Sequence, residues 1–300
     1  MTHRTAVIGL GAMGGGMARA ALSGGLEVLG LDVDAGRVSA FQAEGGIAGE
    51  AAEVGPTLDS VAVVVVNAAQ TEGAVFGEGG IAAHLRPGAV VVSCATMAPD
   101  VAKRLAATAE AAGLLWLDAP ISGGAAKAAA GKLSVMASGP RMAIKAAGPL
   151  MEACAETVFD LGDEIGAGSA MKAVNQLLAG THIAAMGEAV VFAAKLGIEP
   201  AKTVEVISRC AGTSWMFENR GPHIVDNDYE PRSAVDIWLK DLGIVTEIAR
   251  AEKTPVPLAA AALQQFIAAS GAGLGREDDA AVAKVYARGA GVRLPGEDAT

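Results

Sequence analysis

The sequence contains few cysteines, few aromatic side chains and no metal-binding pattern. Its three cysteines, Cys94, Cys154 and Cys210, are widely spaced and form no CxxC, which argues against a disulfide framework or a zinc knuckle. The four histidines form no HExxH or H-x-H spacing, so we predict no metal site. Aromatic residues make up 4% of the chain and glycine occurs 39 times, a composition that favours close helix packing over an all-β sandwich.

The chain also lacks a positive charge balance, a leader-like start and a long uncharged apolar run. Its formal net charge of −10 disfavours nucleic acid and anionic lipid as partners, although a small anionic substrate remains compatible with a local positive field. The first residues, MTHRTAVIGLG, do not have the layout of a signal peptide. Residues 177–194 come closest to a membrane span, but they contain His182 and Glu188 and so predict a buried helix. We expect a cytoplasmic protein.

The first half of the sequence alternates between short apolar runs and helical patterns. The clearest run is VAVVVV at 61–66, whose β-branched residues are typical of a parallel strand buried on both faces. Further strands are expected at 5–8, 27–31, 89–92, 114–117, 133–137 and 157–161. This alternation predicts an α/β fold with a doubly wound parallel sheet of the Rossmann type.

The pattern changes after Gly168, where no convincing strand follows. Helical segments are expected at about 168–196, 200–211, 233–251, 257–271 and 277–287, and prolines punctuate them. With 300 residues the chain is long enough for two domains. We therefore predict two domains, a Rossmann-type α/β domain at 1–165 and an all-helical domain at 166–300.

A glycine-rich loop follows the first expected strand and opens a helix. It reads GLGAMG and comprises Gly9, Leu10, Gly11, Ala12, Met13 and Gly14. Glycines at these spacings permit a tight turn, a close approach of backbone to a pyrophosphate, and helix–strand packing. Asp32 ends the second strand, where a carboxylate can accept hydrogen bonds from an adenosine ribose and would repel a 2′-phosphate. We predict that these residues bind NAD in preference to NADP.

Lys172 lies in GSAMKAVNQ at 168–176, at the start of an otherwise apolar helix. The i, i+3 and i+4 spacing places Lys172, Asn175 and Gln176 on one helix face. A partly desolvated amine can exchange a proton with an alcohol or carbonyl oxygen, and an amide can hold the same oxygen or a neighbouring hydroxyl. Lys172 is therefore our candidate catalytic residue, although a lysine that reaches from the helix start to water remains an alternative.

Other candidate ligand contacts follow the ends of expected strands, where ligands bind in doubly wound sheets. In DAPISGG at 118–124, Ser122, Gly123 and Gly124 precede a helical stretch and can cradle a carboxylate, or can simply form a flexible connection. Thr96 can contact the nicotinamide or substrate, or belong to the cap of a helix near Pro99. Asn67 occupies a similar position after VAVVVV.

Two different classes of function remain open at this point. Ser169 and Lys172 form an S-x-x-K, the spacing found in serine acyl-enzymes, but no companion SDN or KTG motif accompanies them. A protein that senses dinucleotides without catalysis would share the glycine loop but would show no turnover with any hydroxyacid.

Four motifs, in the order in which they follow along the chain, resemble those of the β-hydroxyacid dehydrogenase family, which includes 3-hydroxyisobutyrate dehydrogenases. GLGAMG, DAPISGG, GSAMKAVNQ and LKDLG at 239–243 carry the resemblance, which covers nearly the whole chain. It implies that Lys172 is catalytic, that Ser122, Gly123, Gly124 and Asn175 bind substrate, and that Thr96 and Lys240 contact the cofactor. It also implies a homodimer or homotetramer.

A finer resemblance is to the L-threonate dehydrogenase branch of that family. It depends on VVVVNAAQ at 63–70, CATMAPD at 94–100, NQLLAGTHIAA at 175–185 and SWMF at 214–217. This resemblance implies NAD-dependent oxidation of L-threonate at its C2 hydroxyl. Oxidation of 3-hydroxyisobutyrate, or reduction of tartronate semialdehyde, succinate semialdehyde or glyoxylate, stays open as an alternative. Trp215, Phe217 and His223 can shape the substrate pocket or belong to the core.

Overall fold

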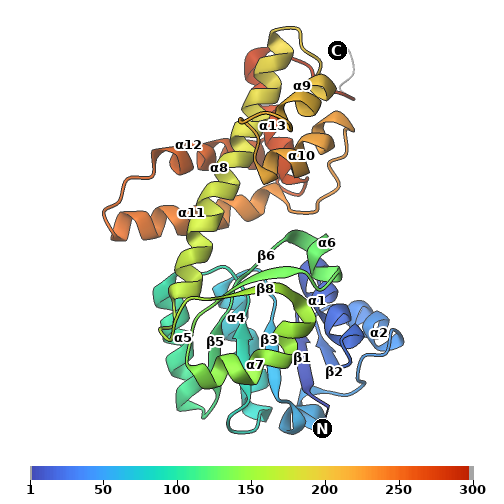
Figure 1. Cartoon of the computed structure of the whole chain (residues 1–300), viewed down its shortest axis with the longest axis vertical. Helices are drawn as coiled ribbons and strands as arrows, with labels where there is room; N and C mark the ends of the chain where they lie inside the picture. The colour runs from blue at the N-terminus through green and yellow to red at the C-terminus, as the bar shows by residue number, and fades with distance from the viewer. Residues whose placement is uncertain (1, 297–300) are drawn as a thin grey trace. The chain divides into compact units, whose positions relative to one another are not determined.

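The computed structural model describes residues 2–296 and divides into two compact units. The division falls between Lys172 and Ala173, inside a long helix. Figure 1 shows the first unit in blue to green and the second in yellow to red.

The first unit contains a five-stranded parallel sheet in the order β2-β1-β3-β4-β5. The strands are β1 (Arg4–Ile8), β2 (Glu27–Leu31), β3 (Ser60–Val63), β4 (Val90–Ser93) and β5 (Leu115–Asp118). An isolated parallel bridge between Leu29 and Ile47 extends the sheet beyond β2. The order reverses between β1 and β3, and this is the switch point at which such sheets bind ligands.

Helices cover both faces of this sheet, as its apolar strands require (Figure 1). Val7 and Ala62 belong to one apolar core, whereas their neighbours Ile8 and Val61 belong to another. Successive side chains of a strand point to opposite faces, so each face needs its own helical cover. The helices are α1 (Ala12–Ser23), α2 (Ala35–Ala43), α3 (Ala51–Val54), α4 (Ala68–Phe76), α5 (Pro99–Ala111), α6 (Gly124–Ala129) and α7 (Arg141–Cys154). The predicted α/β fold is therefore confirmed.

The last two expected strands of this half do not join the parallel sheet. They form a separate sheet with β6 (Ile121–Ser122), in which β7 (Leu133–Ala137) pairs antiparallel with β6 and parallel with β8 (Ala155–Asp160). The chain turns at Gly123 and Gly124, where φ is 133° and 76°, values that only glycine adopts readily. The prediction that 133–137 and 157–161 continue the parallel sheet was wrong because β7 pairs with the short strand β6, which precedes this turn, and with β8.

Within its described residues the second unit consists of helices and loops without a strand, apart from an isolated bridge between Ala234 and Asp278. Its helices are the greater part of α8 (Ala167–Lys195), with α9 (Pro200–Ile207), α10 (Trp215–Val225), α11 (Val235–Ala251), α12 (Pro257–Ala269) and α13 (Val282–Ala290). Trp238 of α11 stacks on Phe266 of α12 in its core, with ring centroids 5.7 Å apart. Helix α10 is not among the helices expected from the sequence. Its start is capped by the Ser214 hydroxyl, which accepts a hydrogen bond from Phe217 N.

Helix α8 is, within residues 2–296, long and apolar enough to cross a membrane by length and composition alone. Its buried residues Ala179, Ile183 and Val190 belong to the core of the second unit. The buried polar side chains of Lys172 and Gln176 also donate hydrogen bonds to protein acceptors. We therefore interpret α8 as a core helix.

Candidate active site

The glycine loop connects β1 to α1 at the switch point of the sheet. Gly9 has a φ of +93°, and a Cβ there would lie 2.4 Å from the carbonyl oxygen of Val64. A Cβ on Gly14 would lie 1.8 Å from the carbonyl oxygen of Gly9, so the start of α1 packs directly on the loop. A Cβ on Gly11, by contrast, would meet only the Arg37 guanidinium, at 3.9 Å. Gly11 therefore leaves room for a ligand to approach the backbone.

The N-terminus of α1 suits an anionic ligand. Gly11 occupies the N-cap position, no side chain caps the helix, and its first turn, which includes Ala12 and Met13, contains no acidic residue. The first N–H groups of a helix have no partner within the helix and carry a partial positive charge. The loop and the helix start thus fit the pyrophosphate of a dinucleotide.

Asp32 follows β2 and holds the glycine loop from beside it. Its carboxylate accepts hydrogen bonds from Leu10 N at 2.6 Å and Asp34 N at 2.9 Å, and Arg37 Nη1 lies 3.6 Å away. Burial raises the pKa of Asp32, but these N–H groups and the Arg37 charge outweigh it, so the pKa lies below its ordinary value. Asp32 is therefore a firmly ionised carboxylate beside the glycine loop.

Asn67 and Thr96 follow β3 and β4 at the same edge of the sheet. Asn67 caps α4, because its Oδ1 accepts a hydrogen bond from Gln70 N at 2.9 Å. Thr96 is half-buried, and α5 begins after Ala98 without a side-chain cap, so Thr96 does not cap that helix. The structure gives Asn67 a local role and leaves Thr96 at the strand end, where the sequence predicted it.

The segment 118–124 brings the predicted carboxylate cradle next to Lys172. Ser122 is in β6, and Gly123 and Gly124 begin α6. Lys172 is only 8% exposed, and its Nζ donates a hydrogen bond of 2.9 Å to the carbonyl oxygen of Ile121, the residue before Ser122. Lys172 is thus a buried amine held beside the cradle and not a lysine that extends to water.

Asn175 and Lys240 belong to the second unit, where they join one polar network. Asn175 Nδ2 donates to Gln176 Oε1 at 2.9 Å, and Gln176 Nε2 donates to Asp241 Oδ2. The ammonium of Lys240 lies 2.7 Å from Asp241 Oδ1. The motifs GSAMKAVNQ and LKDLG therefore meet in space, although nothing in either motif alone predicts that they do.

Asp118 is the site residue that sequence reasoning missed. Its carboxylate is 1% exposed and accepts hydrogen bonds from Gly166 N, Ser169 N and Ser169 Oγ. Burial raises the pKa of Asp118, while the bonds from Ser169 and Gly166 act in the opposite direction. The available signal was an aspartate that ends a buried strand directly before the cradle. Ser169 is itself fully buried and uses its hydroxyl as a donor, which argues against the serine acyl-enzyme.

Trp215, Phe217 and His223, whose roles the sequence left open, have different environments in the structure. Trp215 is 52% exposed, Phe217 belongs to the core of the second unit, and His223 Nδ1 lies 2.8 Å from Asp278 Oδ1. Phe217 therefore has a packing role. Among residues 2–296, no group of three or more His, Cys, Asp or Glu side chains could hold a metal ion.

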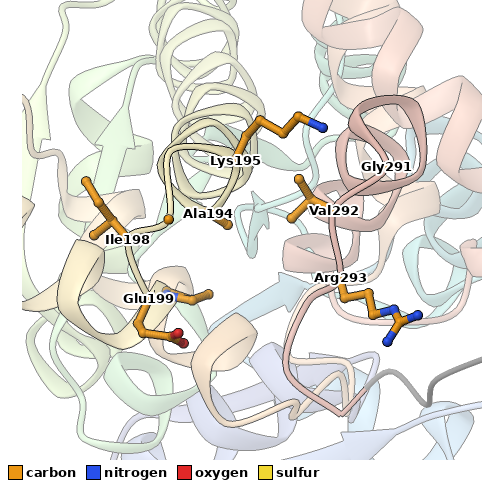
Figure 2. A pocket seen from close by; sticks show the side chains of 9 residues that line it. Ala194, Lys195, Ile198, Glu199, Gly291, Val292 and Arg293 are labelled. Atoms are coloured by element: carbon orange, nitrogen blue, oxygen red, sulfur yellow. The ribbon is translucent and has the colours of Figure 1, made fainter.

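A surface pocket of about 320 Å³ lies in the second unit, between the end of α8 and residues 291–293. Figure 2 shows Lys195, Glu199 and Arg293 around it, with Val292 and Ile198 as apolar neighbours. None of the predicted site residues lines this pocket, so it is separate from the groups described above.

Comparison with known proteins identifies the relatives of the chain. Residues 4–162 match the family described as the NAD binding domain of 6-phosphogluconate dehydrogenase. Residues 166–286 match the family described as the NAD-binding of NADP-dependent 3-hydroxyisobutyrate dehydrogenase.

The similar proteins match over nearly their full length. An L-threonate dehydrogenase from Cupriavidus necator is 47% identical over 99% of both chains. One from Escherichia coli K12 is 46% identical, over 97% of this chain and 96% of that one. A solved structure called 3-hydroxyisobutyrate dehydrogenase, from Salmonella typhimurium, is 45% identical with a TM-score of 0.90, and the match covers 94% of this chain and 99% of that one. Together with the fold and the glycine loop, these matches show that the chain belongs to the 3-hydroxyisobutyrate dehydrogenase-like family of NAD-dependent hydroxyacid dehydrogenases.

Proposed function

We propose that this dehydrogenase oxidises L-threonate at its C2 hydroxyl to the 2-oxo acid, with Lys172 as the group that handles the hydroxyl proton. The observation that carries the proposal is the buried Lys172 amine, whose Nζ is 2.9 Å from the backbone oxygen next to Ser122. The relatives named L-threonate dehydrogenase support the choice of substrate.

The chain's own residues divide the work as follows. Gly9, Gly11 and Gly14, with the start of α1 and Asp32, hold NAD, whose nicotinamide accepts the hydride when the cofactor is bound. Ser122, Gly123 and Gly124 receive the substrate carboxylate through a hydroxyl and backbone N–H groups. This binding orients the C2 hydroxyl of the substrate.

Lys172 acts on the oriented hydroxyl. Its neutral amine takes the proton from the C2 oxygen during oxidation, and its ammonium returns a proton to the carbonyl oxygen during reduction. Asn175 binds the substrate through its amide, and Thr96 and Lys240 contact the cofactor or substrate. The buried hydrogen bond to Ile121 O limits where the amine can move, which favours one geometry for transfer.

Lys172→Ala tests this proposal directly. Loss of the acid–base group should lower kcat about 10²- to 10⁴-fold and leave the Kd for NAD almost unchanged. Lys195→Ala is the matched control, because Lys195 is on the same helix and also donates to a backbone oxygen, at 2.9 Å, but is exposed and outside the site. Near-normal turnover of Lys172→Ala would refute the proposal.

The solved structure named 3-hydroxyisobutyrate dehydrogenase favours a second candidate substrate. Both compounds carry a carboxylate that the same cradle can bind, so the assay must compare them directly. The kcat/KM for NADH formation should be higher with L-threonate than with 3-hydroxyisobutyrate. The kcat/KM for reduction of tartronate semialdehyde and of succinate semialdehyde should be lower still. The reverse order would move the assignment to 3-hydroxyisobutyrate.

We also propose a cytoplasmic homodimer or homotetramer that assembles through the helical unit. Leu178 and Phe192 of α8, and Leu196 directly after the helix, are 49%, 65% and 63% exposed, and such large exposed apolar side chains suit contact with a second copy. The family resemblance supports the same assembly. A monomeric mass in sedimentation analysis would contradict this proposal.

A further inference from the structure

The start of α8 is fixed by a residue far away in the sequence. Asp118, at the end of β5, receives three hydrogen bonds from residues 166–169: Gly166 N at 3.0 Å, Ser169 N at 2.9 Å and Ser169 Oγ at 2.7 Å. The Ser138 hydroxyl donates to the same carboxylate at 3.3 Å and accepts from Gly168 N at 2.9 Å. The first N–H groups of α8 are therefore satisfied by β5 and by the chain after β7.

Helix α8 has little else in its own sequence to fix its start. No acidic residue lies in its first turn, and the residue before the helix is Gly166, with a φ of +100°. A carboxylate at a helix N-terminus satisfies N–H groups and interacts favourably with the helix dipole. Asp118 supplies both effects from another element of the fold.

The same contact determines where Lys172 lies. Lys172 comes three residues after Ser169, so the two side chains are on the same face of the helix. Asp118 holds Ser169, and Ile121, three residues after Asp118, accepts the hydrogen bond from Lys172 Nζ. The segment 118–121 thus contacts α8 twice, one turn of helix apart.

The packing leaves α8 no freedom to slide at this place. A Cβ on Gly168 would lie 2.4 Å from the carbonyl oxygen of Met136 and 2.7 Å from that of Asp118. The backbone of α8 therefore lies directly against β5 and β7. Any rotation or shift of its first turn breaks the bonds to Asp118 and moves the amine of Lys172.

We propose that Asp118 is a positioning residue. It fixes the rotation of α8 about its own axis and the position of its first turn against β5, and so places the Lys172 amine beside the cradle at Ser122. This inference rests on the proposed role of Lys172. Catalysis is sensitive to such placement, since a displacement of about 1 Å can cost about 10²-fold in rate. Asp118 acts through Lys172 and not by contact with substrate or cofactor.

Asp118→Asn and Ser169→Ala test the inference at two strengths. The amide keeps the size of the side chain but loses the charge and presents an NH₂ to N–H donors, so kcat should fall about 10- to 100-fold. Ser169→Ala removes only the hydroxyl bond, which makes it the milder variant if Asp118→Asn folds poorly, and kcat should fall about 3- to 10-fold. In both variants the Kd for NAD should stay within about twofold of wild type.

Ser60→Ala is the matched control for loss of a buried hydrogen bond in the same unit. Its hydroxyl lies 2.8 Å from Thr5 Oγ1, at the first residue of β3 and thus at the opposite end of the strand from the ligand edge. It should lower Tm without changing kcat.

A double-mutant cycle separates positioning from general damage. If Asp118 acts through the lysine, adding Asp118→Asn to Lys172→Ala should change the residual kcat by less than about twofold. A further loss as large as that of Asp118→Asn alone would refute the positioning role. Unchanged kcat in both Asp118→Asn and Ser169→Ala, with an inactive Lys172→Ala, would also refute it and leave the proposed function standing. An active Lys172→Ala would overturn the proposed function itself.

Discussion

The choice between NAD and NADP should depend on the charge of Asp32, and Asp32→Asn isolates that charge. An asparagine keeps one oxygen that can accept the hydrogen bond now made by Leu10 N at 2.6 Å, so the glycine loop keeps its support, while its NH₂ takes the place of the oxygen that accepts from Asp34 N. The negative charge that favours ribose hydroxyls and repels a 2′-phosphate is lost. Arg37 remains, with Nη1 3.6 Å from the present carboxylate position.

The magnitude follows from the hydrogen bonds involved. A hydrogen bond to a charged acceptor contributes about 1.5–3 kcal/mol and one to a neutral acceptor about 0.5–1.5 kcal/mol. The two hydrogen bonds from the ribose hydroxyls therefore lose together about 2–3 kcal/mol of binding free energy. This corresponds to a decrease of about 30- to 150-fold in kcat/KM for NAD. Removal of the repulsion, with Arg37 available as a cation, should raise kcat/KM for NADP about tenfold or more.

The assay is steady-state kinetics with one hydroxyacid and both cofactors. Asp34→Asn is the control, because Asp34 is two residues away and also lies near Arg37, at 3.5 Å, but does not hold the glycine loop through its side chain. A cofactor ratio that changes less than about threefold in Asp32→Asn, or a wild-type enzyme that prefers NADP, would refute the reasoning.

The pH dependence gives a second test of the same carboxylate. Because the folded pKa of Asp32 is lowered, its contribution is fully present above the unfolded pKa of about 3.9 and is lost only as pH falls through the lower folded value. The Kd for NAD should therefore stay constant from about pH 8 down to about pH 5. A weakening of NAD binding near pH 5 that Asp32→Asn abolishes would contradict this.

The remaining predictions concern packing and thiol chemistry. Gly14→Ala places a Cβ 1.8 Å from Gly9 O and should destabilise the fold by about 3 kcal/mol or more, whereas Gly73→Ala in α4, where a Cβ meets nothing within 4 Å, should stabilise it by about 0.5–1 kcal/mol. Chemical denaturation compares the two, and equal stabilities would contradict the geometry. Burial raises the pKa of Cys94 and Cys154 to about 12, so a thiol reagent should modify only the exposed third cysteine of the native protein. Rapid reaction of more than one thiol would refute this.

The sequence predicts the parallel sheet well because its signals are local. Runs such as Val61–Val63 need two buried faces, and GLGAMG combines a strand end, a turn and a helix start in adjacent residues. The family resemblance, which depends on several motifs in a fixed order, then identifies Lys172 and the carboxylate cradle as candidate site residues. In the structure, the hydrogen bond from Lys172 to Ile121 O brings the two together.

The rest depends on contacts between distant residues, which local patterns do not contain. The segments 133–137 and 157–161 read as strands, but whether they extend the parallel sheet depends on the strands they pair with, and β7 pairs with β6 and β8. Helix α10 contains Gly221 and Pro222, which lower its local helix signal although the fold accommodates them. Asp118 reads as an ordinary strand end until its partners at the start of α8 are known.

The division of the chain inside α8 has a consequence for the construction of chimeric dehydrogenases. Lys172 and the carboxylate of Asp118 belong to the same compact unit, although the helix that carries the lysine continues beyond it. A fusion joined at the start of α8 would separate Lys172 from the strand that ends at Asp118. The lysine would then contact the corresponding strand of another protein. A junction placed after residue 172 would exchange only the second unit. It would transfer Lys172, Asp118 and the glycine loop together.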